Sequence, residues 1–185
     1  MNLAAAIQKR FIIMEGVNKE LSAYLQAKRM SFSRFFFLAD EELLQILAQT
    51  KNVEMVQDHI QKCFEGIKSL TFQPSKEESG LKDITQMVSP EGEIVPLQRS
   101  ILAKGDVDLW LSELEIQMKA TMKHYMFECY RDYLSTVQNA ESRPFEDYST
   151  LMGPREIWLA KGPAQTVNIL SQVAWTVETE RALRE

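Results

Sequence analysis

The sequence predicts a mainly α-helical protein with one small β-hairpin. Apolar residues recur at steps of three and four through several long segments, which is the spacing of one helix face. Two short runs rich in β-branched residues, at 84–88 and 93–97, flank a turn that contains Pro90 and Gly92. Polar stretches with Pro or Gly separate these segments. We therefore expect a helix content well above the roughly one-third that is average for globular proteins.

The composition is that of a globular chain. Its 185 residues suffice for one or two compact units, and a hydrophobic fraction of 45% suffices for a core. A net charge of −5 without a basic block argues against nucleic acid as a partner. No apolar run approaches the roughly 20 residues of a membrane span, so we expect no membrane partner. The two cysteines argue against a disulfide framework and fit a reducing cytosolic compartment.

The first predicted helix has an apolar face that we expect to pack on a core, formed by Leu3, Ile7, Phe11, Met14, Val17, Leu21 and Tyr24. Five further helices are expected: one over 41–49 with Asp40 as its cap, one from Val53 to Leu70, one that opens at Gly105-Asp106, one that begins at Gly162-Pro163, and a last one capped by Thr176. The helix after Gly105 carries a wide apolar stripe, which indicates several neighbours or a Met-rich groove for partner helices. The run 139–153 is expected to be irregular.

Residues 28–44 connect the first two helices and carry an aromatic cluster, with four phenylalanines in six positions. Burying each ring contributes roughly 1.5–3 kcal/mol relative to exposure, so we expect the connector to be pressed into a core between helices. The alternative is an exposed aromatic patch that marks a binding site. The predicted structural core residues are Phe32, Phe35, Phe36, Phe37, Trp110 and Trp175.

The hairpin is the predicted contact element. The polar run 71–82 before it is expected to be a loop. Pro90 and Gly92 suit the second and fourth positions of a type I turn. Pro96 cannot donate a ladder hydrogen bond, so its strand should be an edge strand. The hairpin either only covers one side of a helix or presents its tip to a partner; the candidate interface is this tip, Ser89, Pro90, Glu91 and Gly92.

We predict three parts. The first helical bundle part with its Phe-rich connector spans 1–75, the loop and hairpin span 76–104, and the long helix with a second helical part spans 105–185. A helical pattern is already under way at Leu3, and another is still running at the last residues. We therefore expect the chain to be a piece of a larger protein.

Motifs for catalysis or metal binding are weak. The chain contains no Gly-x-x-x-x-Gly-Lys-Ser/Thr phosphate loop and no Gly-x-Ser-x-Gly elbow. The carboxylate pairs Glu113/Glu115 and Glu91/Glu93 do not share a helix face or a predicted pocket. The one conceivable zinc set lacks the ligand spacing of known zinc sites: His59, Cys63, His124 and Cys129. We expect no catalytic, cofactor or metal site in this chain.

The connector also carries a resemblance. Its run Lys-Arg-x-x-Phe-x-Arg-Phe-Phe-Phe-Leu-x-Asp-Glu-Glu-Leu-Leu resembles the linker region of dynein heavy chains. Ser33 and Ala39 depart from it, since the family usually has proline and serine there, and 161–165 lacks the family's Trp-Pro-Gly-Gln. The resemblance continues at collinear spacing through 46–52, His59, 62–67, 91–95, Trp110-Leu111, Glu113, Glu115, 165–167, Ser171-Gln172, Trp175-Thr176 and Glu178.

The resemblance implies an elongated set of helical bundles that arches over a ring of AAA+ ATPase modules and bends with their nucleotide state. This segment resembles the half nearer the first module. The implied partners are the chain's own AAA+ ring, the rest of the linker, microtubules and other dynein subunits. No cofactor is implied within the segment, whereas ATP and Mg²⁺ would bind the parent ring. The run 63–67 resembles axonemal dyneins, which implies a cytoskeletal location in the cytoplasm and in the cilium or flagellum.

Two function classes follow. The first is a mechanical segment of a motor ATPase, and the second is a helical adaptor that binds other proteins. A motor segment should be followed in its parent chain by a phosphate-binding loop, of order 100–150 residues downstream.

Overall fold

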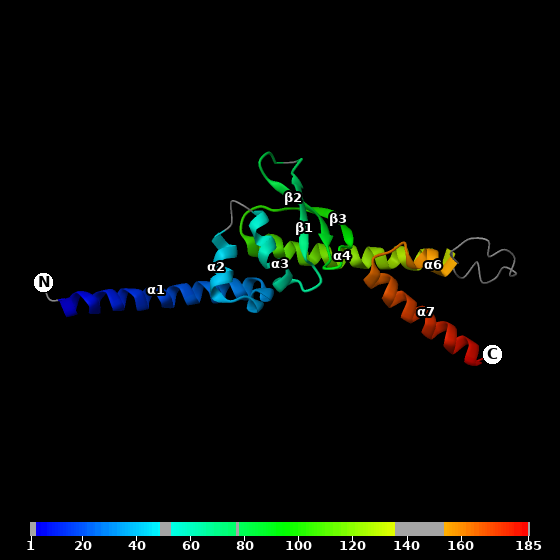
Figure 1. The fold of residues 1–185 in the computed structure, drawn as a ribbon, viewed down its shortest axis with the longest axis horizontal. Helices are drawn as coiled ribbons and strands as arrows, with labels where there is room; N and C mark the ends of the chain where they lie inside the picture. The colour runs from blue at the N-terminus through cyan, green and yellow to red at the C-terminus, as the bar shows by residue number, and fades with distance from the viewer. Residues whose placement is uncertain (1–2, 49–52, 77, 136–153, 185) are drawn as a thin grey trace. The chain divides into compact units, whose positions relative to one another are not determined.

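The computed structural model describes residues 3–48, 53–76, 78–135 and 154–184 (Figure 1). It is mainly helical with one small antiparallel sheet, which confirms the predicted fold class. The chain divides into two compact units, the first formed by 1–96 with 100–115 and the second by 97–99 with 116–185. The elements are α1 (Leu3–Ser31), η1 (Ser33–Phe37), α2 (Asp40–Ala48), η2 (Val53–Val56), α3 (Gln57–Cys63), β1 (Ser69–Pro74), β2 (Lys82–Val88), β3 (Ile94–Leu102), α4 (Val107–Tyr133), α6 (Pro154–Leu159) and α7 (Ala164–Arg184).

The sheet has three strands in the order β1-β2-β3, so the predicted hairpin of β2 and β3 is joined by a strand that the sequence did not predict. The expected helix from Val53 to Leu70 is wrong beyond Cys63, because Phe64 adopts extended backbone and α3 ends there. Likewise, the expected loop 71–82 contains part of β1. Apolar residues such as Ile67 and Leu70, three apart, do not distinguish the last turn of a helix from the start of a strand.

The position of Pro96 confirms one sequence prediction. Pro96 lies in β3 and pairs with Gln86 of β2, and β3 is an edge strand of this sheet. Leu97 to Arg99 then leave the β2 ladder, since the register passes from Pro96 directly to Ile101. In the second unit, the backbone N–H of Gln98 donates to Thr121 Oγ1 at 3.0 Å, which satisfies a hydroxyl that is fully buried.

The connector after α1 forms the short 3₁₀ helix η1, and this geometry determines which of its aromatic rings are buried and which are exposed. A 3₁₀ helix has three residues per turn, so residues three apart share a face. Phe32, Phe35 and Leu38 are accordingly buried, and the rings of Phe32 and Phe35 meet edge to face at 5.0 Å. Phe36 and Phe37 point elsewhere and are 54% and 70% exposed. Their predicted core positions are therefore wrong in this chain.

The apolar face of α1 is also not a core face. The helix forms as predicted, but Leu3, Ile7, Phe11, Met14, Val17 and Tyr24 are all exposed. Only its last turns enter the core of the first unit, beginning with the buried Leu25. Periodicity predicts that one face is apolar, but it does not reveal whether this chain supplies the element that covers that face.

The ends of two helices differ from the prediction. α2 begins at Asp40 instead of after it, with the Ala39 carbonyl accepting from Leu43. α7 runs without a break through Thr176, whose Oγ1 donates to the Gln172 carbonyl instead of capping a new helix. The expected irregular run 139–153 lies outside the described residues.

The second unit has its own small core of Cys129, Tyr133, Trp158, Val167 and Ala174. Trp158 from α6 donates its indole N–H to the Cys129 carbonyl of α4 at 2.8 Å. Gly162 makes this packing possible, because a Cβ there would lie only 2.7 Å from Cys129 Sγ. Trp175, predicted as core, is instead 67% exposed, since it is one position past Ala174 and so turns about 100° away from the buried face of α7.

The contrast between two adjacent rings gives a direct test of the connector geometry. Phe35→Ala should reduce the free energy of unfolding by about 3–5 kcal/mol, because its ring is fully buried. Phe36→Ala is the matched control and should change it by less than about 1 kcal/mol. Urea titrations of both variants measure the difference. Equal losses for the two rings would contradict the 3₁₀ arrangement.

Candidate functional site

The hairpin tip forms a tight, ordered turn in the first unit. The Gly92 N–H donates to the Ser89 carbonyl at 3.1 Å, and the Ser89 N–H donates to the Glu93 carbonyl at 2.9 Å. Gly92 has φ +89°, a backbone conformation that favours glycine. A three-residue loop that ends in such a residue is a common hairpin connection. Pro90 and Glu91 are exposed at its apex, so the tip can present one carboxylate to a partner.

A second site joins the end of α1 to the start of α4, and we call it the clasp: Lys28, Ser31, Asp106 and Asp108. Lys28 Nζ lies 2.8 Å from Asp106 Oδ2 and 2.8 Å from Asp108 Oδ1. Ser31 Oγ donates to the other carboxylate oxygen of Asp108 at 2.7 Å. The partners lie about 80 positions apart in the sequence, so the clasp joins two distant segments of the first unit.

The clasp is anchored by a carboxylate with little access to water. The side chain of Asp108 is 4% exposed and that of Lys28 is 16% exposed. Burial by itself raises the pKa of Asp108, but hydrogen bonds from Lys28 and Ser31 outweigh it, and the pKa lies below its ordinary value. Hydrogen bonds to Asp106 and Asp108 raise the pKa of Lys28. Both partners are therefore charged at neutral pH.

Two arginines hold the connector beside the clasp. Arg29 donates to the Leu38 carbonyl at 3.0 Å and pairs with Asp40 at 2.7 Å, which ties the end of α1 to the start of α2. Arg34 donates to the Cys63 carbonyl at 3.0 Å, and its guanidinium lies 4.6 Å from the centre of the Phe64 ring. These contacts join the connector to α1 and to α3, and they join α1 to α2.

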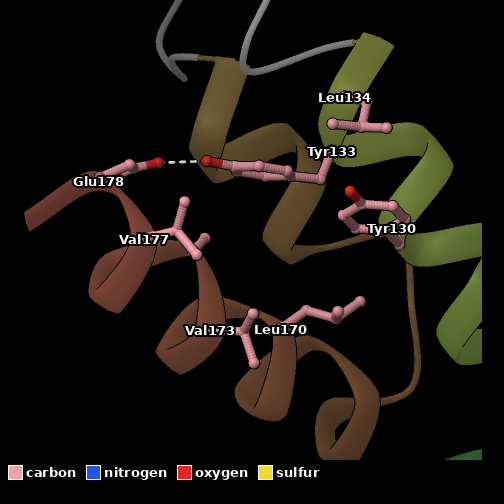
Figure 2. Close-up of a pocket in the computed structure, with 8 residues that line it drawn as sticks. Tyr130, Tyr133, Leu134, Leu170, Val173, Val177 and Glu178 are labelled. Carbon is pink, nitrogen blue, oxygen red and sulfur yellow. Dashed lines mark hydrogen bonds between the residues drawn. The ribbon is translucent and has the colours of Figure 1, made fainter. Parts of the chain in front are cut away.

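In the second unit, hydrogen bonds from side chains of α4 and α6 converge on one carboxylate of α7, beside a small pocket (Figure 2). Glu178 accepts hydrogen bonds from the Tyr133 hydroxyl and from Arg155, the latter at 2.9 Å. Burial raises the pKa of Glu178, but these two hydrogen bonds more than offset that effect, so the pKa is lowered. The pocket has a volume of about 130 Å³ and is mostly apolar, lined by Tyr130, Tyr133, Leu134, Leu170, Val173, Ala174, Val177 and Glu178.

The two cysteines are buried thiols whose pKa values are raised. Burial raises the pKa of the Cys63 thiol to about 11, and burial also raises the pKa of Cys129. Both are free thiols. Among the residues that the structure describes, no three His, Cys, Asp or Glu side chains are grouped so that they could hold a metal ion. Within the same described residues, no helix is long and apolar enough to cross a membrane.

The structure separates the predicted site residues into groups. The tip residues 89–92 form the predicted turn, while Phe32, Phe35 and Trp110 lie in the core of the first unit. Sequence reasoning missed the clasp. Its only sequence signal is a pair of acids, Asp106 and Asp108, at the start of a helix, and such acids also suit an ordinary helix N-terminus.

The fold and these sites define a helical segment built around polar joints. Residues 3–129 match the family model described as "Dynein heavy chain, N-terminal region 2". The chain therefore belongs to the dynein heavy chain family.

Individual relatives match almost the whole chain. It is 36% identical over 186 residues to human dynein axonemal heavy chain 3, covering 99% of this chain, and 39% identical over 171 residues to human dynein axonemal heavy chain 1, covering 92%. It is also 31% identical over 172 residues to cytoplasmic dynein 2 heavy chain 1 of Tripneustes gratilla, covering 93%. The chain spans about 4% of the length of each of these relatives.

The clasp predicts a pH-dependent stability. Asp108→Asn should lower the free energy of unfolding by about 1.5–3 kcal/mol at pH 7, because it removes a charged hydrogen-bond acceptor. Unfolded Asp titrates near pH 3.9 and folded Asp108 titrates lower, so its contribution is complete at neutral pH and is lost as the pH falls below about 4.

Urea titrations of the wild-type chain and Asp108→Asn at pH 7 and at pH 3 measure this effect. Asp58→Asn serves as the control, since Asp58 is an exposed acid in the first turn of α3. A deficit of Asp108→Asn that is equally large at both pH values would contradict the assignment.

Proposed function

We propose that this chain is a mechanical segment of the linker of a dynein heavy chain. In this role it bends over the AAA+ ring of its parent and converts ATP-driven changes into a microtubule power stroke. The segment itself contributes no catalysis; ATP and Mg²⁺ belong to the parent ring. Family membership and the likeness to axonemal and cytoplasmic dyneins support the proposal.

The clasp is the observation that carries this proposal. A segment that passes force must keep its helices joined under load, and hydrogen-bonded charge pairs shielded from water hold a defined geometry. The clasp joins the end of α1 to the start of α4 by three polar contacts of 2.7–2.8 Å. Arg29 and Arg34 fix the intervening connector in the same unit. This arrangement suits a stiff joint better than it suits a flexible tether.

The hairpin tip is the proposed contact of this segment with the parent ring or with a neighbouring part of the linker. Its turn is ordered by three hydrogen bonds, so little conformational entropy is lost when it binds. A tip contact made in one nucleotide state only would shift the equilibrium between linker positions. Equal contacts in both states would shift nothing.

The remaining partners follow from the same role. We infer that the parent chain acts with microtubules and other dynein subunits, and that it works in the cytoskeleton, with the axoneme of a cilium or flagellum as the preferred location. The axonemal heavy chains among its relatives support that location.

A helical adaptor is the second candidate, and the exposed apolar residues along α1 are the observation that favours it. An adaptor would use this stripe to bind a separate protein. A motor segment would instead change ATPase coupling when the tip or the clasp is altered.

Altering the tip in the full motor tests the proposed role. Replacing Pro90 and Glu91 with Gly and Ser should leave the unfolding midpoint near wild type, because both side chains are exposed. Microtubule gliding velocity or microtubule-stimulated ATPase activity should change, because the tip contact is lost.

The matched control is Lys76→Ser with Ser79→Gly in the connection between β1 and β2, at the opposite end of β2 from the tip. This control should leave both motor readouts at wild-type values. If the tip variant also retains wild-type stability, gliding velocity and ATPase activity, the tip is only a connection between strands.

A further inference from the structure

Ser31 combines two features that nothing in the proposed role requires. It is an exposed residue at the end of α1, and its hydroxyl is held in the clasp by a hydrogen bond to Asp108. It also follows two basic residues, Lys28 and Arg29, at the third and second positions before it. Many serine/threonine kinases choose substrates by such charge patterns. Ser33 is also exposed, but Met30 and Ser31 occupy the matching positions before it.

We propose that Ser31 is a phosphorylation site for a basic-residue-directed serine/threonine kinase, and that a phosphate there prevents the opened clasp from closing again. In the transfer, Ser31 Oγ forms a bond to the γ-phosphorus of ATP and the bond from that phosphorus to the β,γ-bridging oxygen breaks. ADP leaves, and the hydroxyl proton passes to the catalytic aspartate of the kinase.

Repulsion between the negative charge of the phosphate and the carboxylates of the clasp explains why the modified clasp stays open. Ser31 Oγ now donates a hydrogen bond to Asp108 Oδ2 at 2.7 Å. A phosphoserine carries a charge of roughly −1.5 to −2 and only accepts hydrogen bonds once it is a dianion. The clasp at present holds two carboxylates and one ammonium, so its net charge is −1. Adding a phosphate within hydrogen-bond distance of Asp108 leaves Lys28 as the one cation of the clasp against three anions.

The position at a helix end adds to this repulsion. The C-terminal end of a helix carries partial negative charge, and a phosphate placed there destabilises the last turn. Arg29 is a second cation near Ser31 in the sequence, but it is already paired with Asp40 and with the Leu38 carbonyl. A phosphate that recruited Arg29 would take it from the connector, which also loosens the joint.

The folded clasp limits access of the kinase, so modification follows opening. The side chains of Lys28 and Arg29 are 16% and 15% exposed, whereas a kinase must reach both. The last turn of α1 must therefore unwind before transfer. Phosphorylation then captures the open state, and the modification rate reports how often the clasp opens. Effects on a motor rest on the proposed function, but the modification and the opening do not.

The test uses the parent heavy chain, the catalytic subunit of cyclic-AMP-dependent protein kinase and Mg-ATP. Mass spectrometry should find phosphate on Ser31 and not on Ser33. Asp108→Asn weakens the clasp and should raise the initial rate at Ser31 about threefold or more, while the control Asp58→Asn leaves it unchanged. Hydrogen exchange after modification should be about tenfold faster or more at the hydrogen-bonded amides of 28–31 and 109–112.

Three results would overturn the proposal. In the first, a synthetic peptide of residues 26–38 is phosphorylated while Ser31 of the heavy chain is not. In the second, Asp108→Asn leaves the rate at Ser31 unchanged. In the third, phosphorylated Ser31 leaves hydrogen exchange at both helix ends unchanged. None of these readouts uses motility. The phosphorylation proposal can therefore fail while the mechanical role stands, and the mechanical role can fail while the phosphorylation proposal stands.

Discussion

The ion pair of Lys28 with Asp108 is the constraint on which the first unit depends. It joins residues 80 positions apart, and between them lie the connector, α2, α3 and the whole sheet. Other ion pairs, such as Lys104 with Glu78 or Arg184 with Glu180, lie between partners that are both exposed to water. Such exposed pairs contribute roughly 0–1 kcal/mol, whereas removing one partner of a shielded pair leaves an uncompensated charge and destabilises by several times more.

Sequence reasoning succeeded where local pattern decides the structure. The helices α1 and α4, the turn at Pro90 and Gly92, and the edge position of Pro96 all follow from periodicity or from backbone chemistry. It failed where the outcome depends on distant contacts. Phe35 and Phe36 are adjacent and of the same residue type. Phe35 is buried and Phe36 is exposed because a 3₁₀ helix has three residues per turn.

The clasp shows the same limit more sharply. A basic residue at the end of one helix and an acid at the start of another each have a local explanation, namely interaction with the helix dipole. Only the fold brings Lys28 and Asp108 together. The proposed mechanical role, the contact at the hairpin tip and the control by phosphate at Ser31 all assume that this joint is stiff when the clasp is closed. The energetic coupling within the clasp is therefore the central quantity.

A double-mutant cycle measures that coupling most directly. The free energies of unfolding of the wild type, Lys28→Gln, Asp108→Asn and the double variant give the interaction energy of the pair. The same cycle on the exposed pair, with Lys104→Gln and Glu78→Gln, provides the reference. We predict a coupling of about 1–3 kcal/mol for Lys28 with Asp108 and less than about 1 kcal/mol for the exposed pair. A coupling for Lys28 with Asp108 that is no larger than the reference would contradict the account.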